Sequence, residues 1–100
     1  MALEGRGISY YDLSVEIHRS ARKHGVTDSA ARHAIAHAIV IVDLDPDNEP
    51  PKVLAIGPDH AGNLLEIIWI ELDAGREVVI HAMGLRATFR GLLDDWEKRE

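Results

Sequence analysis

Residues 64–83 read LLEIIWIELDAGREVVIHAM, and this stretch decides the fold. Two runs rich in branched apolar residues, 64–72 and 77–83, flank the short segment Asp73–Arg76. Branched apolar residues are typical of strands, and a short segment containing glycine joins antiparallel neighbours. The stretch therefore predicts a β-hairpin.

The register of this hairpin depends on the length of its turn. A turn of two or of four residues places Glu66 opposite Met83 and Ile68 opposite His81. Glu66 and His81 then share a face of the sheet as diagonal neighbours, roughly 7–8 Å apart between backbone positions. A turn of three residues instead shifts the register by one and puts these two side chains on opposite faces. Alternation along the second strand places Val79, His81 and Met83 on one face.

The segments outside the hairpin complete an α+β pattern. The expected elements are helices over residues 12–24, 27–38 and 87–98 and strands over residues 39–44, 53–57, 64–72 and 77–83. Short turns between successive strands indicate an antiparallel meander. The sequence therefore predicts a single α+β domain over residues 1–100, with two N-terminal helices, a four-stranded sheet and a C-terminal helix in two layers.

The first of these helices is predicted from the spacing of its buried positions. Residues spaced by four, four and three positions form one helical stripe: Leu13, Ile17, Ala21 and His24. Asp12 is the expected N-cap, and Gly25 is expected to end the helix with a positive φ angle. We interpret His24 as a packed or capping histidine at the end of this stripe.

Composition excludes several classes of protein. Of the 100 residues, 46% are apolar and 28% charged, which is a globular balance, and there is no apolar run long enough to span a membrane. Cysteine is absent, which excludes disulfides and thiolate chemistry. The N-terminus lacks the apolar core of a secretion signal, so we expect a cytoplasmic protein. A net charge of -6 argues against binding nucleic acid through a global positive field.

The polar residues on the hairpin suggest an acid–base site. Glu66 and His81 each stand alone among apolar neighbours, so they could form either an acid–base pair or a buried structural ion pair. Arg86 and Arg90 are one helical turn apart near the start of the last helix. They could bind a phosphate or a carboxylate, or they could pair with acidic residues of the same helix, Asp94 and Asp95.

Two other patterns could hold a metal ion, but each is weak. His33 and His37 have the i, i+4 spacing of metal ligands, without the glutamate of a metalloprotease motif. The acidic segment 43–49 lacks the glycine and the distal glutamate of a calcium loop. We therefore predict no metal site and no cofactor.

Several short motifs, in their order along the chain, resemble a known group of proteins. These motifs are Lys23-His24-Gly25-Val26, Ile56-Gly57, Gly62-Asn63-Leu64-Leu65-Glu66, and His81-Ala82-Met83 followed by Arg86. Over about residues 12–95 the chain resembles the BrnT-like branch of the RelE/ParE toxin superfamily of bacteria. The resemblance implies a type II toxin with a RelE-like fold that binds a cognate antitoxin, through which it could oligomerise, and cleaves messenger RNA without a metal, commonly on the ribosome. Other members of the superfamily poison DNA gyrase.

The resemblance also implies roles for individual residues. Glu66 or His81 would be the base, Arg86 the phosphate clamp, and His60 or Lys52 the acid. Arg90 would support Arg86, and Lys52 and Arg90 would also bind substrate. Many BrnT-like chains have an arginine two positions after the residue that matches His81. Here that position is Met83. This departure and the acidic balance favour an alternative function, a non-catalytic toxin-like module that binds protein; a gyrase poison is a further alternative.

Overall fold

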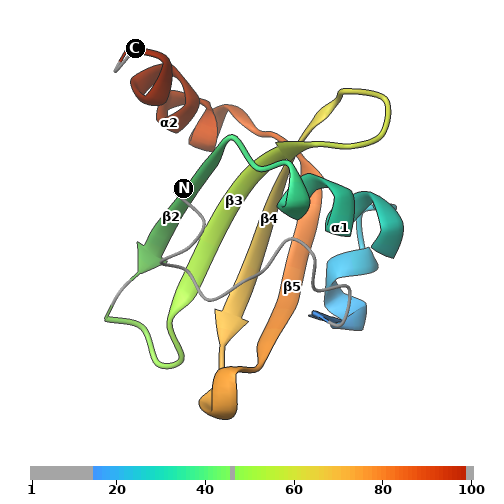
Figure 1. Ribbon diagram of the computed structural model, residues 1–100, viewed down its shortest axis with the longest axis vertical. Helices are drawn as coiled ribbons and strands as arrows, with labels where there is room; N and C mark the ends of the chain where they lie inside the picture. The colour runs from blue at the N-terminus through green and yellow to red at the C-terminus, as the bar shows by residue number, and fades with distance from the viewer. Residues whose placement is uncertain (1–14, 46, 99–100) are drawn as a thin grey trace.

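The computed structural model describes residues 15–45 and 47–98, except for the side chains of residues 96–98. Five strands form one mixed sheet in the order β1-β5-β4-β3-β2 (Figure 1). The strands are β1 (Glu16–Ile17), β2 (Val40–Asp45), β3 (Lys52–Pro58), β4 (Leu64–Glu71) and β5 (Glu77–Gly84). The α-helices are α1 (Asp28–Ala36) and α2 (Ala87–Lys98), and the short 3₁₀ helices are η2 (Arg19–Arg22) and η3 (Asp73–Gly75).

The predicted α+β class and the antiparallel meander are confirmed. Strands β2 to β5 pair antiparallel with their neighbours in sequence, and α2 follows the sheet. The helix predicted over 27–38 is also confirmed, because α1 begins after Thr27, whose hydroxyl accepts a hydrogen bond from the backbone N–H of Ala30. No α-helix in the described part of the chain is long and apolar enough to span a bilayer.

The prediction of a first helix over 12–24 is wrong for the residues that the structure describes. Asp12 and Leu13 lie outside the described residues, whereas Glu16 and Ile17 form β1, parallel to Val78 and Val79 of β5. The edge of β5 offers unpaired backbone groups, and pairing with them outweighs the weak local preference for a helix. Within residues 15–45 and 47–98, one α-helix therefore precedes the meander, and the sheet has five strands rather than four.

The end of the predicted helix is correct in one respect and wrong in another. Gly25 has a φ angle of 81°, as a chain-reversing glycine should. His24, however, is exposed rather than packed in the core. Of the apolar positions that precede it in the described residues, Ala21 of η2 is 1% exposed and Ile17 is partly buried against the core. The spacing therefore identified buried residues but not the secondary structure that buries them.

The β4–β5 hairpin has the predicted register near Glu66 and His81, but a β-bulge rather than the length of the turn produces it. The backbone N–H of Leu72 donates to the carbonyl of Arg76 across a three-residue turn, Asp73–Gly75, which shifts the register by one. A β-bulge then inserts Ile80 as an extra residue in β5 and restores the register. Glu66 consequently pairs with Met83, and Ile68 pairs with His81. These are the pairs expected from a turn of two or of four residues.

The bulge also changes which side chains of β5 share a face. Val79 pairs with Trp69 and belongs to the core beneath α1. His81 pairs with Ile68 on the opposite face, so the predicted single row of Val79, His81 and Met83 is wrong. The hydroxyl of Ser20 in η2 donates to the carbonyl of Ile80 at 2.8 Å. This bond gives the extra residue a hydrogen-bond partner that the ladder does not supply.

Helices α1 and α2 pack against apolar clusters on opposite faces of the sheet. Figure 1 shows α1 in front of the sheet and α2 near the start of β2. Ala31, Ala34 and Ile35 of α1 pack on one apolar cluster, and Leu93 of α2 packs on another that includes Val40 and Ile56. Glu66 alternates with residues of the α1 cluster along β4, so its side chain lies on the α2 face. The joint between β5 and α2 is therefore close to the carboxylate of Glu66.

The turn between β4 and β5 contains a residue in an unfavourable conformation. Ala74 has a φ angle of 63°, in the left-handed region where a Cβ atom is disfavoured. Ala74→Gly is expected to raise the free energy of unfolding by up to about 1 kcal/mol, after allowance for the greater freedom of glycine in the unfolded chain. Gly75, with a φ angle of 74°, is the matched control, because Gly75→Ala should lower that free energy. Equilibrium urea denaturation of the two variants measures both effects. Equal stability of both variants would contradict this account of the turn.

Candidate functional site

The candidate site lies where β4, β5 and the start of α2 meet. Its centre is Glu66, whose side chain is 0% exposed. Ile56 and Met83 are its cross-strand neighbours, so the carboxylate stands in an apolar row of the sheet. A carboxylate in such a place is stable only when its oxygens are hydrogen bonded.

Both oxygens of Glu66 accept hydrogen bonds from two residues further along the chain. Oε2 accepts from Nε2 of His81 at 2.8 Å, and from Nε and Nη2 of Arg86 at 2.9 and 2.6 Å. Oε1 accepts from the backbone N–H of Arg86 at 2.9 Å. We call Glu66, His81 and Arg86 the carboxylate cluster. The predicted proximity of Glu66 and His81 is therefore confirmed.

The carboxylate cluster determines the charge state of Glu66. Burial favours the neutral acid, but the hydrogen bonds from Arg86 and His81 outweigh burial and hold the pKa of Glu66 below its ordinary value. The same pairing with Glu66 raises the pKa of Arg86. Glu66 is thus an ionised hydrogen-bond acceptor with no free oxygen. It orients its two partners and is poorly placed to act as the base itself.

The bond to Glu66 also sets the tautomer of His81. An ionised carboxylate can only accept hydrogen bonds, so Nε2 of His81 carries the proton and Nδ1 carries the lone pair when the ring is neutral. Nδ1 makes no hydrogen bond to another described residue, and the side chain is 22% exposed. A carboxylate that orients an imidazole in this way is the arrangement that hydrolytic enzymes use to prepare a general base.

A second imidazole lies beside His81. The ring of His24 packs against the ring of His81 with centroids 5.8 Å apart and planes at 71°. Gly25, by its positive φ angle, reverses the chain directly after His24. Sequence reasoning missed His24 as a site residue, because the predicted helix assigned it to the core. The signal that points to His24 in the sequence is the motif Lys23-His24-Gly25-Val26, which is part of the resemblance to BrnT-like chains.

Arg86 supplies the positive charge of the site. Its side chain is 48% exposed, although Nε and Nη2 are bound to Glu66. The guanidinium carbon lies 5.6 Å from the centre of the Phe89 ring, a cation–π contact that limits its movement. Nη1 makes no hydrogen bond to any other residue that the structure describes. Arg90 is exposed and follows one turn later on α2.

Two residues predicted for the site lie away from it. His60 is in the β3–β4 turn and stacks on His33 of α1, on the face of the sheet opposite Glu66. Lys52 begins β3, four residues from Ile56, which is the β3 partner of Glu66. Four residues of strand span about 13 Å. The structure therefore brings together Glu66, His81 and Arg86, and leaves His60 and Lys52 outside the carboxylate cluster.

Comparison with known proteins adds no relative. No family model, curated protein or solved structure matches this chain. The fold and the site define a small α+β domain with a carboxylate–imidazole–guanidinium cluster at one end of a mixed sheet. Any assignment of activity depends on the chemistry of that cluster.

Proposed function

We propose that this protein is the toxin of a type II toxin–antitoxin pair and that it cleaves messenger RNA with its own side chains, without a metal. The single observation that carries the proposal is the carboxylate-oriented imidazole of His81, with a guanidinium and a second imidazole beside it. These are the groups that 2′-hydroxyl attack on a phosphodiester requires: a base, a cation and an acid. The motif resemblance to BrnT-like toxins supports the same function, a cytoplasmic location and a cognate antitoxin as partner.

Each group has one role in the proposed reaction. Nδ1 of His81 takes the proton of the ribose 2′-hydroxyl, and the 2′-oxygen attacks the adjacent phosphorus. The free side of the Arg86 guanidinium stabilises the developing negative charge on the phosphoryl oxygens. The bond from phosphorus to the 5′-oxygen breaks, and that oxygen takes a proton from the His24 imidazolium. The products are a 2′,3′-cyclic phosphate and a 5′-hydroxyl, and water restores the protons.

The roles of His60 and Lys52 change in this proposal. His24 replaces both as the acid, because it is the imidazole in contact with His81. Met83 pairs with Glu66, so the guanidinium that many BrnT-like chains carry at that position is absent. Arg86 stands in for it, because it reaches the same carboxylate from the start of α2.

Cleavage of a defined RNA tests the proposal. The purified protein is expected to produce 2′,3′-cyclic phosphate ends from a short single-stranded RNA, with or without a chelator. His81→Ala and His24→Ala should each lower the rate by about 10²–10⁴-fold, the usual range for general acid–base catalysis. The dependence of the rate on pH should be bell-shaped, because one imidazole must be neutral and the other protonated.

The control for these variants is His18→Asn. His18 is exposed and caps η2, and an asparagine preserves the capping acceptor while removing an imidazole. This variant should cleave RNA at the wild-type rate. Full activity in both His81→Ala and His24→Ala, with the folds intact, would refute the catalytic assignment.

A non-catalytic protein-binding module is the second candidate function, and one observation favours it. The backbone N–H of Arg86 and two of its side-chain nitrogens all bind Glu66, so the carboxylate cluster also anchors α2 to the sheet. A cluster used only as an anchor predicts no RNA cleavage at any protein concentration. It also predicts stable association with the product of a neighbouring gene, unchanged by His24→Ala.

A further inference from the structure

We propose that a groove on the outer side of α1 binds a phosphate group. The groove lies between α1 and the β3–β4 turn and has a volume of about 610 Å³. Its polar lining consists of Asp28, Ser29, Arg32, His33, His37 and His60. The groove is on the α1 face of the sheet, opposite Glu66, so the site is independent of the proposed nuclease chemistry. Its volume is within the range of small-molecule sites.

Three imidazoles form a stack along the groove. The ring of His33 lies between those of His37 and His60, with centroid distances of 4.2 Å on each side. The planes of His33 and His37 differ by 23°, and those of His33 and His60 by 39°. His33 and His37 come from one helix, and His60 comes from the turn beyond β3. The sequence revealed the first pair, but only the fold adds the third ring.

Backbone carbonyls determine which nitrogen of each helical imidazole is available. Nδ1 of His33 donates to the carbonyl of Pro58 at 2.8 Å, and Nδ1 of His37 donates to the carbonyl of His33 at 2.9 Å. A carbonyl can only accept, so Nδ1 carries a proton in both rings. Nε2 is therefore the nitrogen that gains a proton when the ring becomes charged, and it then becomes a donor. The carbonyl bonds remain intact in the charged form.

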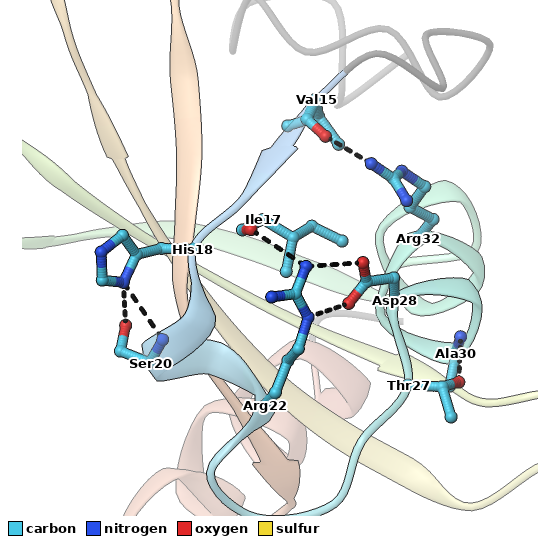
Figure 2. Close-up of polar contacts among 9 residues, drawn as sticks. All are labelled: Val15, Ile17, His18, Ser20, Arg22, Thr27, Asp28, Ala30 and Arg32. Carbon is cyan, nitrogen blue, oxygen red and sulfur yellow. Dashed lines mark hydrogen bonds and ion pairs between the residues drawn. The ribbon is translucent and has the colours of Figure 1, made fainter.

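The fixed charges at the α1 end of the groove favour an anion. Arg32 donates from Nη2 to the carbonyl of Val15 at 2.8 Å, and a carbonyl does not neutralise its positive charge (Figure 2). Asp28 is held by Nε and Nη2 of Arg22 at 2.8 and 2.9 Å, and Figure 2 shows this two-point contact at the start of α1. Arg22 thus neutralises the one acidic side chain of the lining. At this end of the groove Arg22 and Arg32 together carry one more charge than Asp28, in a chain whose net charge is -6.

The neighbouring turn carries one further carboxylate. Asp59 precedes His60, and its side chain accepts hydrogen bonds from the backbone N–H groups of Ala61 and Asn63 at 3.0 and 2.8 Å. These bonds direct the carboxylate into its own turn. Among the residues that the structure describes, the charged groups that face the stack are Arg32 and Asp28 with its partner Arg22 from one side, and Asp59 from the other. These four charges cancel, so the positive charge that binds an anion is that of the protonated imidazoles.

The geometry favours phosphate over a metal ion. A metal requires imidazole lone pairs that converge on one point. Among the residues that the structure describes, no group of three histidine, aspartate or glutamate side chains is arranged to hold a metal. Arg32 would also repel a cation. A phosphate instead accepts hydrogen bonds from protonated imidazoles, and its charge offsets the repulsion between stacked cations.

Calorimetric titration with inorganic phosphate tests this site. Because binding requires protonated imidazoles, the dissociation constant should be at least tenfold lower at about pH 6 than at about pH 8. His60→Ala, a change in an exposed turn, and His33→Gln should each weaken binding at about pH 6 by tenfold or more. His18→Asn should bind phosphate as the wild type does. Titration with a 5′-nucleoside monophosphate and with a short oligonucleotide then distinguishes a free nucleotide from a nucleic-acid backbone as the source of the phosphate.

Three results would overturn the proposal. The first is phosphate affinity that does not change between the two pH values. The second is affinity that survives in folded His60→Ala and His33→Gln. The third is tight binding of Zn²⁺ that all three imidazoles support and that strengthens with rising pH, which would identify a metal site instead. Loss of RNA cleavage in His81→Ala has no bearing on these outcomes, because the two sites lie on opposite faces of the sheet.

Discussion

Glu66→Ala is expected to lower the free energy of unfolding by about 2–4 kcal/mol, because it combines a buried cavity with several lost hydrogen bonds. The side chain is fully buried, and four hydrogen bonds join it to His81 and Arg86. Its removal also leaves the backbone N–H of Arg86 without its acceptor. A domain of this size has about 5–15 kcal/mol of stability, so the loss is a large fraction of the total. Urea denaturation followed by circular dichroism measures the change.

Glu16→Ala is the matched control for this prediction. Glu16 also makes a two-point contact with an arginine, Arg76, at 2.8 Å for each bond. Both of these side chains are about half exposed, so water replaces the pair at little cost in stability. Similar destabilisation by Glu66→Ala and Glu16→Ala would show that burial of the carboxylate cluster is unimportant.

The same carboxylate makes stability depend on pH in a defined direction. The pKa of Glu66 is lower in the folded state than the ordinary value of 4.5, so ionisation of Glu66 stabilises the folded state above that pH. The contribution is lost as the pH falls from about 4.5 through the folded-state pKa. Glu66→Gln removes this contribution and should flatten the acid limb of the stability curve. An acid limb as steep as that of the wild type would assign the pH dependence to other carboxylates.

Gly57→Ala is the second substitution with a large expected effect, a loss of about 3 kcal/mol or more. A Cβ atom at this position would collide with the carbonyl oxygen of Ala34. It would also lie 2.9 Å from the carbonyl carbon of Ala34 and 3.1 Å from the Cα of Ala38. All of these atoms belong to the backbone of α1 and the residues that follow it, so no side-chain rotation can relieve the clash. The helix must move away from β3.

Gly91→Ala is the control for this substitution. Gly91 is exposed in α2, and a Cβ atom built there meets nothing within 4 Å. Alanine is favoured over glycine in a helix, so Gly91→Ala should raise the free energy of unfolding by about 0.5–1 kcal/mol. The two glycine substitutions are therefore expected to have opposite signs. A neutral Gly57→Ala would mean that α1 does not approach the sheet as closely as described.

The Glu66–His81 pair shows how much of the site could be predicted. Alternation along β4 and β5, combined with a turn of two or of four residues, placed the two side chains on one face, and the hydrogen bond at 2.8 Å confirms their proximity. The turn, however, has three residues, and the bulge at Ile80 corrects the register. The carbonyl of Ile80 is bound by Ser20, which lies 60 positions away in sequence. No local pattern could reveal that compensation.

His24 and His60 were misplaced for a related reason. The helical spacing that included His24 was real, but the edge of β5 paired with the segment before it and left His24 exposed beside His81. His60 lies in the turn that leads into β4, the strand that carries Glu66, and this position suggested a role in the same site. The turn instead places its ring against that of His33 on α1. In both cases a long-range contact decided which face of the sheet the imidazole would reach.

The sequence by itself determined the α+β class, the order of the four meander strands, and the presence of α1 and α2. These features follow from apolar periodicity, chain-reversing glycines and helix caps, which act within a few residues. Only the tertiary structure decided that Glu16 and Ile17 form β1 and that Glu66 is bound by Arg86 as well as His81. It also decided that two separate histidine groups form. Those outcomes depend on contacts between residues far apart in the chain. The energies of such contacts exceed the local preference of a segment for helix or strand. They produce no repeating pattern in the sequence from which they could be predicted.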